Sequence, residues 1–135
     1  MKIVLDTNVI VSGLLSPYNS PGTIVRMASD LTIRLCYDAR IISEYDAVLH
    51  RSKFGFVPEK VEAFLEQVRV RGERVAAKPL AKSLSDQTDQ MFLEVALAGK
   101  VKCLVTGNLK HFPKTHCEGM NVFSPTDFLD FYRKV

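Results

Sequence analysis

Short apolar runs alternate along this chain with longer stretches in which apolar residues recur every three or four positions. The short runs have the length of buried strands, and the longer stretches have the period of helices that pack on one face. Alternation of this kind is typical of an α/β fold with a mostly parallel sheet, because each parallel strand is reached through a crossover helix. The pattern predicts strands at residues 2–5, 31–36, 73–77, 101–106 and 121–123.

Capping residues and helix breakers set the ends of the helices between these strands. Ser20, Asp38 and Ser124 are predicted N-caps, because their side chains can accept a hydrogen bond from a backbone N–H in the first turn. Gly99 is a typical stop for the helix before it. The predicted helices span residues 8–15, 20–30, 38–51, 58–71, 86–98 and 124–132.

Length and composition fit one globular unit. The chain has 135 residues, 47% of them apolar, which is enough for a core without disulfides or a structural metal. We therefore expect a single domain over residues 1–135. Cys36, Cys103 and Cys117 contain no CxxC pair, so we expect them to be buried small side chains in a reducing compartment.

The sequence shows no sign of a membrane segment and only a modest excess of positive charge. No apolar stretch approaches the roughly 18 residues that span a bilayer, and Asp6 interrupts any signal-peptide core. We therefore expect a cytoplasmic protein without a membrane partner. The net charge of +3, from 18 basic and 15 acidic residues, favours a polyanionic partner only weakly.

Asp6 stands directly after the first predicted strand. In an open parallel sheet the carboxyl ends of the strands form the crevice where ligands bind, and residues 106–108 (TGN) follow another strand at the same edge. Burying a carboxylate there costs several kcal/mol unless a partner or metal ion compensates it. The alternative is that Asp6 only caps the helix that follows.

Two more acids point toward the core in their predicted helices. Glu44 lies on the apolar stripe of the 38–51 helix, and Asp89 lies in the first turn of the 86–98 helix at the start of its stripe. Glu44 has the alternative of a surface pair with Arg40 or Arg51. Asp86 is expected to act mainly as a cap, and Glu94 falls off the stripe and is expected to be solvated.

Three carboxylates in one crevice need a cation. Two unit charges about 4 Å apart repel by on the order of 4 kcal/mol at an effective dielectric constant near 20. Oxygen ligands of this kind suit Mg²⁺ or Mn²⁺. The histidines show no spacing typical of a zinc site, so we expect surface or loop positions for His50, His111 and His116.

Four sequence blocks together resemble the PIN-domain family, in particular its small prokaryotic VapC-type members. They are IVLDTNVIVSGLL, ISEYDAVLHRSKF, SDQTDQMFLEVALAG and LVTGNLKHF, in this order over nearly the whole chain. The resemblance implies a three-layer α/β/α sandwich around a mostly parallel five-stranded sheet. It also implies a Mg²⁺- or Mn²⁺-dependent endoribonuclease that leaves 5′-phosphate ends, with Asp6, Glu44 and Asp89 as catalytic and metal-binding residues.

One position departs from the family pattern. The fourth acid of the family falls at Asn108, which brings an oxygen but no charge, so the number of metal ions is open. Asn108 and Asp86 are the further candidate metal ligands. The resemblance gives Thr7, Asn8 and Thr106 supporting roles around the acids, with Asn8 or Thr106 orienting Asp6 by a hydrogen bond; helix and turn capping is the alternative.

Basic residues beside the motif blocks are the candidates for RNA contact, namely Arg51, Lys53, Lys110 and His111. A basic run over residues 69–82 is either a phosphate-binding segment or a solvated face. By resemblance the chain would be a toxin with an antitoxin partner and would form a homodimer. The alternative function is a degenerate PIN domain that binds RNA or a protein without cleavage.

Overall fold

The computed structural model describes residues 1–135. Its strands are β1 (Lys2–Leu5), β2 (Arg34–Tyr37), β3 (Glu73–Arg74), β4 (Cys103–Val105) and β5 (Val122–Phe123). Its α-helices are α1 (Thr7–Leu15), α2 (Ser20–Ser29), α3 (Ala39–Leu49), α4 (Pro58–Arg71), α5 (Gln87–Ala98) and α6 (Pro125–Arg133). Short 3₁₀ turns form η1 (Ser52–Phe54), η2 (Leu109–His111) and η3 (Lys114–His116).

The five strands form one sheet in the order β3-β2-β1-β4-β5, and all neighbours are parallel. Ile3 of the central strand β1 pairs with Leu35 on one side and with Cys103 on the other. Such a strand is covered on both faces, and Ile3, Val4 and Leu5 are fully buried. The predicted α/β class and five-stranded sheet are confirmed.

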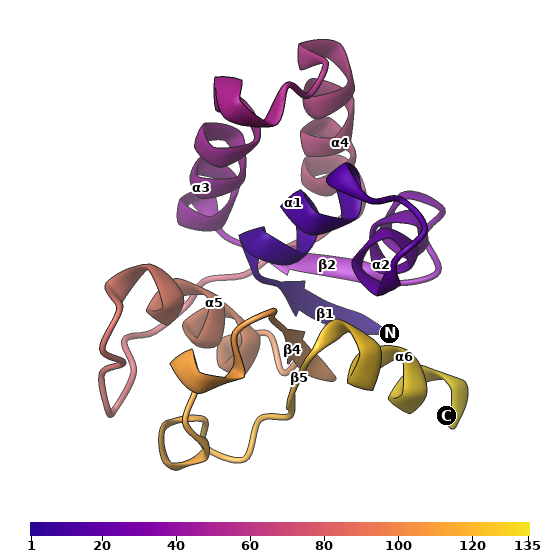
Figure 1. Cartoon of the computed structure of the whole chain (residues 1–135). Coiled ribbons are helices and arrows are strands. Elements are labelled where there is room, and N and C mark those ends of the chain that lie inside the picture. The colour runs from indigo at the N-terminus through magenta and orange to yellow at the C-terminus, as the bar shows by residue number, and fades with distance from the viewer.

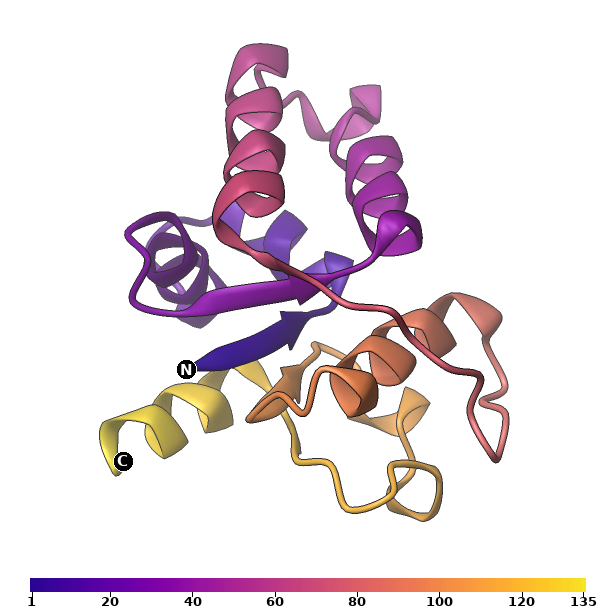
Figure 2. The same cartoon turned by 180° about the vertical axis from the view of Figure 1, so that it is seen from behind.

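Helices cover both faces of this sheet. Helices α1 to α4 gather on one side of β1 and β2, whereas α5 lies on the other side, as the two opposite views show (Figures 1 and 2). Helix α5 packs against β1, β2 and β4, and α6 packs against α2 and the edge strand β5. The carboxyl ends of β1 and β4 lie side by side because these two strands are neighbours in the sheet. None of the helices is both long and apolar enough to cross a membrane.

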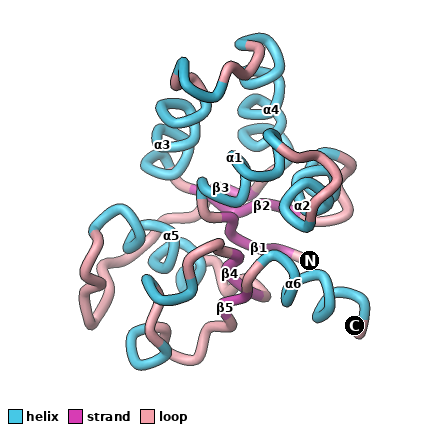
Figure 3. The backbone as a smooth tube through the Cα atoms, viewed as in Figure 1, coloured by secondary structure: helices cyan, strands magenta, loops and turns pink.

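Most predicted elements exist, and Figure 3 shows how helices, strands and loops follow one another in the fold. Several predicted ends were wrong by a few residues. Asn19, not Ser20, caps α2, since its Oδ1 accepts from the Gly22 N–H at 2.8 Å. Strand β2 begins at Arg34, because Asp30 Oδ1 accepts from the Thr32 N–H and Leu31 has a left-handed backbone with φ of 67°. Asp38 and Ser124 cap their helices as predicted.

The three cysteines are buried and form no disulfide, as predicted. Burial raises the pKa of Cys103 to about 12 and that of Cys36 to about 11, so neither thiol ionises at neutral pH.

Glu94 is not solvated, and the prediction for it was wrong. It is 7% exposed, its Oε1 lies 2.8 Å from Nη1 of Arg40, and its Oε2 accepts from the Leu80 N–H at 3.2 Å. Arg40, which also pairs with Asp38, is therefore not the partner of Glu44. The Arg40–Glu94 ion pair joins α3 to α5, the two helices that carry Glu44 and Asp89.

We expect Glu94→Ala to lower the free energy of unfolding by about 2–3 kcal/mol, because the guanidinium of Arg40 and the Leu80 N–H lose their acceptor. Glu66→Ala is the matched control: Glu66 is exposed, 3.6 Å from Arg69 in the same helix, and should change the free energy by less than about 0.5 kcal/mol. Urea unfolding measures both values. Equally small changes in the free energy of unfolding for both variants would contradict the stabilising role of the Arg40–Glu94 ion pair.

Candidate metal centre at the carboxyl edge of the sheet

A cleft of about 530 Å³ opens beyond the carboxyl end of β1. We call it the acidic cleft, because four acidic side chains line it: Asp6, Glu44, Asp86 and Asp89. They come from the end of β1, from α3 and from the N-terminal turn of α5. Three sequence-predicted acids from distant segments therefore meet at one surface.

Asp6 is buried at the base of the cleft, 7% exposed. It occupies the N-cap position of α1, and although its side chain makes no regular capping hydrogen bond, the backbone N–H groups of Thr7 and Asn8 lower its pKa. Its Oδ2 accepts from the Thr106 hydroxyl at 2.8 Å, across 100 residues of chain. Burial raises the pKa of Asp6, and the hydrogen bond from Thr106 offsets part of that rise.

Glu44 is half-buried and reaches the cleft from α3. Its neighbour Tyr45 is fully buried and donates a hydrogen bond of 2.5 Å to the carbonyl of Leu5, the residue before Asp6. Burial raises the pKa of Tyr45, and the charges of Asp6 and Glu44 raise it further, so Tyr45 stays a neutral donor. This bond fastens α3 to the end of β1 and so holds Glu44 near Asp6.

Asp89 lies in the first turn of α5 and is 7% exposed. Nδ1 of His111 lies 2.9 Å from its Oδ2, but the two atoms are not aligned for a hydrogen bond, and this buried oxygen has no hydrogen-bond partner. Burial raises the pKa of Asp89, the charge of Asp6 raises it further, and His111 acts in the opposite direction. A bound cation would give this oxygen of Asp89 a partner. It would also reduce the repulsion between Asp89 and Asp6.

The group of possible metal-ligand atoms that lie closest to one another in the acidic cleft differs from the predicted set. Atoms of Asp86, Asp89 and His111 all lie within 4.8 Å of one another, whereas Asp6, Glu44 and Asp89 line the cleft without forming so tight a group. The sequence predicted His111 as an RNA contact and not as a possible metal ligand, because the histidines show no metal-site spacing. Its place three residues after Asn108 was the available signal.

The residues expected to support the acids behave differently from one another. Thr106 holds Asp6, as described above, and its Oγ1 also accepts from the Asn108 N–H at 3.0 Å. Asn8 does not orient Asp6; its Oδ1 accepts from the Gly107 N–H at 3.2 Å and holds the turn after β4. The Thr7 hydroxyl is buried without a partner. Asp86 caps α5 by accepting from the Thr88 N–H, as expected.

Basic side chains line the acidic cleft and a hollow that adjoins it. Arg51 lines the acidic cleft together with Phe54 of η1. The adjacent hollow, of about 470 Å³, shares Asp86, Asp89 and His111 with the cleft and adds Lys110 and His116. Lys53 lines neither; its Nζ lies over the ring of Phe54, 5.1 Å from the centroid.

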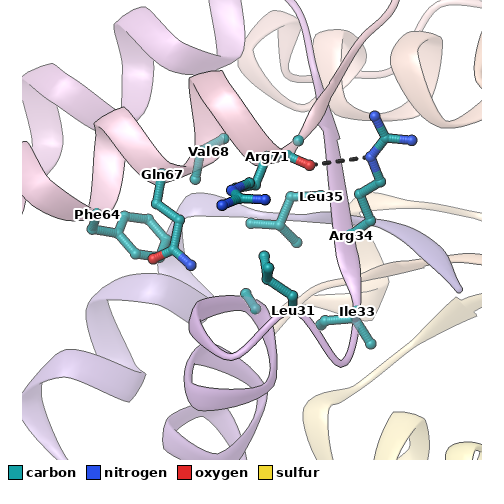
Figure 4. A pocket seen from close by; sticks show the side chains of 10 residues that line it. Leu31, Ile33, Arg34, Leu35, Phe64, Gln67, Val68 and Arg71 are labelled. Carbon is teal, nitrogen blue, oxygen red and sulfur yellow. Dashed lines mark hydrogen bonds between the residues drawn. The ribbon is translucent and has the colours of Figure 1, made fainter.

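A third hollow lies away from the acids, between α2, β2 and α4 (Figure 4). Apolar side chains such as Phe64 and Val68 face Arg34 and Arg71 there, and Nε of Arg34 donates to the Arg71 carbonyl at 3.1 Å. Its cavity volume of about 10 Å³ holds about one water molecule. It is too small for a substrate.

Known proteins resemble this chain in sequence and in fold. A family model described as the PIN domain matches residues 2–110. One chain of the crystal structure of VapBC2 from Rickettsia felis bound to a DNA fragment from their promoter has the same fold, with a TM-score of 0.57 and 15% sequence identity. That alignment covers 92% of this chain and 98% of the other. No curated protein matches the sequence.

We expect Asp89→Asn to raise the melting temperature of the metal-free protein at pH 7 by roughly 3–5 °C, the shift that about 1 kcal/mol gives in a domain of this size. The folded-state pKa of Asp89 is raised, so its carboxylate opposes folding above the ordinary value of 3.8, and stability falls as the pH rises toward the folded-state pKa. The gain should therefore vanish below pH 3.8.

Thermal unfolding in the presence of a chelator, at pH 3 and at pH 7, measures this difference. Asp130→Asn, at an exposed site on α6, is the control and should not change the melting temperature measurably at either pH. A variant that is less stable than the wild type at pH 7 would show that the Asp89 carboxylate already has a sufficient partner within the protein.

Proposed function

This chain belongs to the PIN-domain family, and on that premise we propose that it is an endoribonuclease that depends on Mg²⁺ or Mn²⁺ and hydrolyses RNA phosphodiester bonds. The observation that carries the proposal is the acidic cleft. Asp6, Glu44 and Asp89 line it from three segments of the chain, and a buried oxygen of Asp89 lacks a partner. Oxygen ligands at the carboxyl edge of a parallel sheet fit a hard divalent ion.

Asp6 and Asp89 would hold the metal ion, with Glu44 beside them and Asn108 and Asp86 as further ligands. A bound Mg²⁺ or Mn²⁺ would supply a nucleophilic water at neutral pH and neutralise charge on the scissile phosphate. Thr106 fixes the direction of the Asp6 carboxylate through its hydroxyl. Glu44 is half-buried at the cleft, and of the three predicted catalytic acids it is the one best exposed to orient a water molecule there.

The basic residues of the acidic cleft and of the adjacent hollow would bind the RNA backbone. Arg51 lines the acidic cleft, and Lys110 lines the adjacent hollow. An RNA strand that crosses the cleft and the hollow would meet both cations. Phe54, half-buried at the cleft, offers a face on which an unpaired base can stack.

The fold likeness to a chain of VapBC2 supports a more specific role. We infer that this protein is the toxin of a toxin–antitoxin pair, that it acts in the cytoplasm, and that an antitoxin covers its acidic cleft. We also infer a homodimer, as expected from the family resemblance. Co-expression with the product of the neighbouring reading frame, followed by co-purification, tests the antitoxin partner.

Asn108 supports a second candidate function, because an acid is missing where the family pattern has one. In this case the protein binds RNA without cleaving it. The three remaining acids would then have no reason to share a cleft, so we favour catalysis. RNA binding without Mn²⁺-dependent cleavage would favour this second function.

We expect Asp6→Asn to abolish Mn²⁺-dependent cleavage of total cellular RNA and to leave the circular dichroism spectrum unchanged. The amide keeps the shape of the side chain but removes the charge that holds the ion. Asp130→Asn, an equal chemical change at an exposed site, should cleave like the wild type. Cleavage by the Asp6→Asn variant at the wild-type rate would contradict the proposed mechanism.

Arg51→Ala and Lys110→Ala should each weaken RNA binding and lower the slope of log affinity against log salt by about 1, because one phosphate contact is lost. Fluorescence anisotropy with a labelled single-stranded RNA library, in the Asp6→Asn background to prevent cleavage, measures both slopes. Arg133→Ala on α6, where Arg133 pairs with Asp130, is the control and should keep the slope. An unchanged slope for Arg51 or Lys110 would place the RNA elsewhere.

A further inference from the structure

The contact between His111 and Asp89 is unusual for a histidine beside a carboxylate. Nδ1 and Oδ2 are 2.9 Å apart, as close as hydrogen-bonded atoms, yet the geometry is not that of a hydrogen bond. Asp89 is only 7% exposed, and Oδ2 itself is buried without a hydrogen-bond partner. In the tautomer that leaves Nδ1 without a proton, this nitrogen and Oδ2 each offer a lone pair to the same place.

A third ligand atom is within reach of the same place. Asp86 forms a group with Asp89 and His111 in which the three atoms lie within 4.8 Å of one another. The capping bond of Asp86 to the Thr88 N–H uses Oδ1, so Oδ2 remains available. The 2.9 Å between Nδ1 and Oδ2 also matches adjacent ligands of an octahedral ion, which lie roughly 3 Å apart when each bond is about 2.1 Å.

Asn108 sits where it can orient the His111 ring. Its Nδ2 lies 2.8 Å from Nε2 of His111. The amide group can also present Oδ1 to this nitrogen after a half-turn, and an Nε2–H that donates to Oδ1 leaves the lone pair on Nδ1. Ligating histidines commonly donate their second N–H to such an acceptor. Because its amide contacts His111, Asn108 is better placed to position the histidine than to serve as the further metal ligand considered above.

We propose that Nδ1 of His111 is a ligand of the metal ion together with Asp86 and Asp89, and that this nitrogen makes the site select Mn²⁺ over Mg²⁺. The inference rests on the proposed function in one respect, that the cleft binds a divalent ion. Mg²⁺ prefers oxygen ligands and keeps its waters, whereas first-row transition ions accept imidazole readily. A histidine and an asparagine take the place of the family's fourth acid in this chain.

The second histidine–acid cluster of the molecule provides a matched control. Atoms of Asp46, His50 and Glu62 also lie within 4.8 Å of one another, but all three residues are exposed. His50 faces Asp46 with Nδ1 at 3.0 Å and Glu62 with Nε2 at 3.1 Å, so its two nitrogens point to different acids. No buried oxygen lacks a partner in this cluster, and we expect no ion there.

Pulsed electron paramagnetic resonance of the Mn²⁺-loaded full chain tests the proposal, because it detects a directly coordinated imidazole nitrogen. We expect nitrogen coupling in the wild type and in His50→Ala, and none in His111→Ala. Calorimetric titration should show that His111→Ala weakens Mn²⁺ binding at least about tenfold and changes Mg²⁺ binding less than about twofold. The side chain of His111 is 45% exposed, so its removal should not unfold the protein.

Asn108→Ala separates positioning from ligation. It should weaken Mn²⁺ binding by about tenfold, as loss of an orienting partner does, and keep the nitrogen coupling. Bound Mn²⁺ without nitrogen coupling in the wild type, or equal weakening of both ions by His111→Ala, would overturn the assignment of His111 and leave the proposed function standing. A wild type that binds no Mn²⁺ would overturn both.

Discussion

The buried carboxylates of Asp6 and Asp89 are the constraint around which this structure is organised. Burial raises the pKa of both carboxyl groups, and the charge of Asp6 raises the pKa of Asp89 further. No run of neighbouring residues could create this pair. It exists because β1 and β4 are adjacent, because Thr106 after β4 holds Asp6, and because α5 begins beside the ends of these strands. A protein keeps such an unfavourable pair where it serves a ligand.

Two contacts fix the position of α3, the helix that carries Glu44, relative to Asp6 and Asp89. The Tyr45 hydroxyl ties α3 to Leu5 at the end of β1, and the Arg40–Glu94 ion pair ties α3 to α5. The side chains that make both contacts do not line the acidic cleft. They are needed because acids that repel one another would otherwise move apart. The stability of the fold and the spacing of the site are therefore coupled.

His111 lies where the acidic cleft and the adjacent hollow meet, and it lines both. In the proposed site, the acids and His111 hold the metal ion, and Arg51 and Lys110 hold the RNA backbone. The chain departs from the family pattern at Asn108. This residue is still connected to the acids, because it contacts His111 and His111 contacts Asp89.

The sequence by itself determined the class of the fold, the five strands and most of the helix caps, because periodicity and capping are local properties that neighbouring residues encode. It also singled out three of the acids that line the acidic cleft. It indicated the side of the helix that Glu44 and Asp89 occupy, but not that of Glu94. Strand ends, the burial of Glu94, the partner of Asn8 and the place of His111 were decided only by the tertiary structure. Each of these depends on a partner far away in the chain, such as Arg40 for Glu94 or Asp89 for His111, and no local pattern specifies a contact over such a separation.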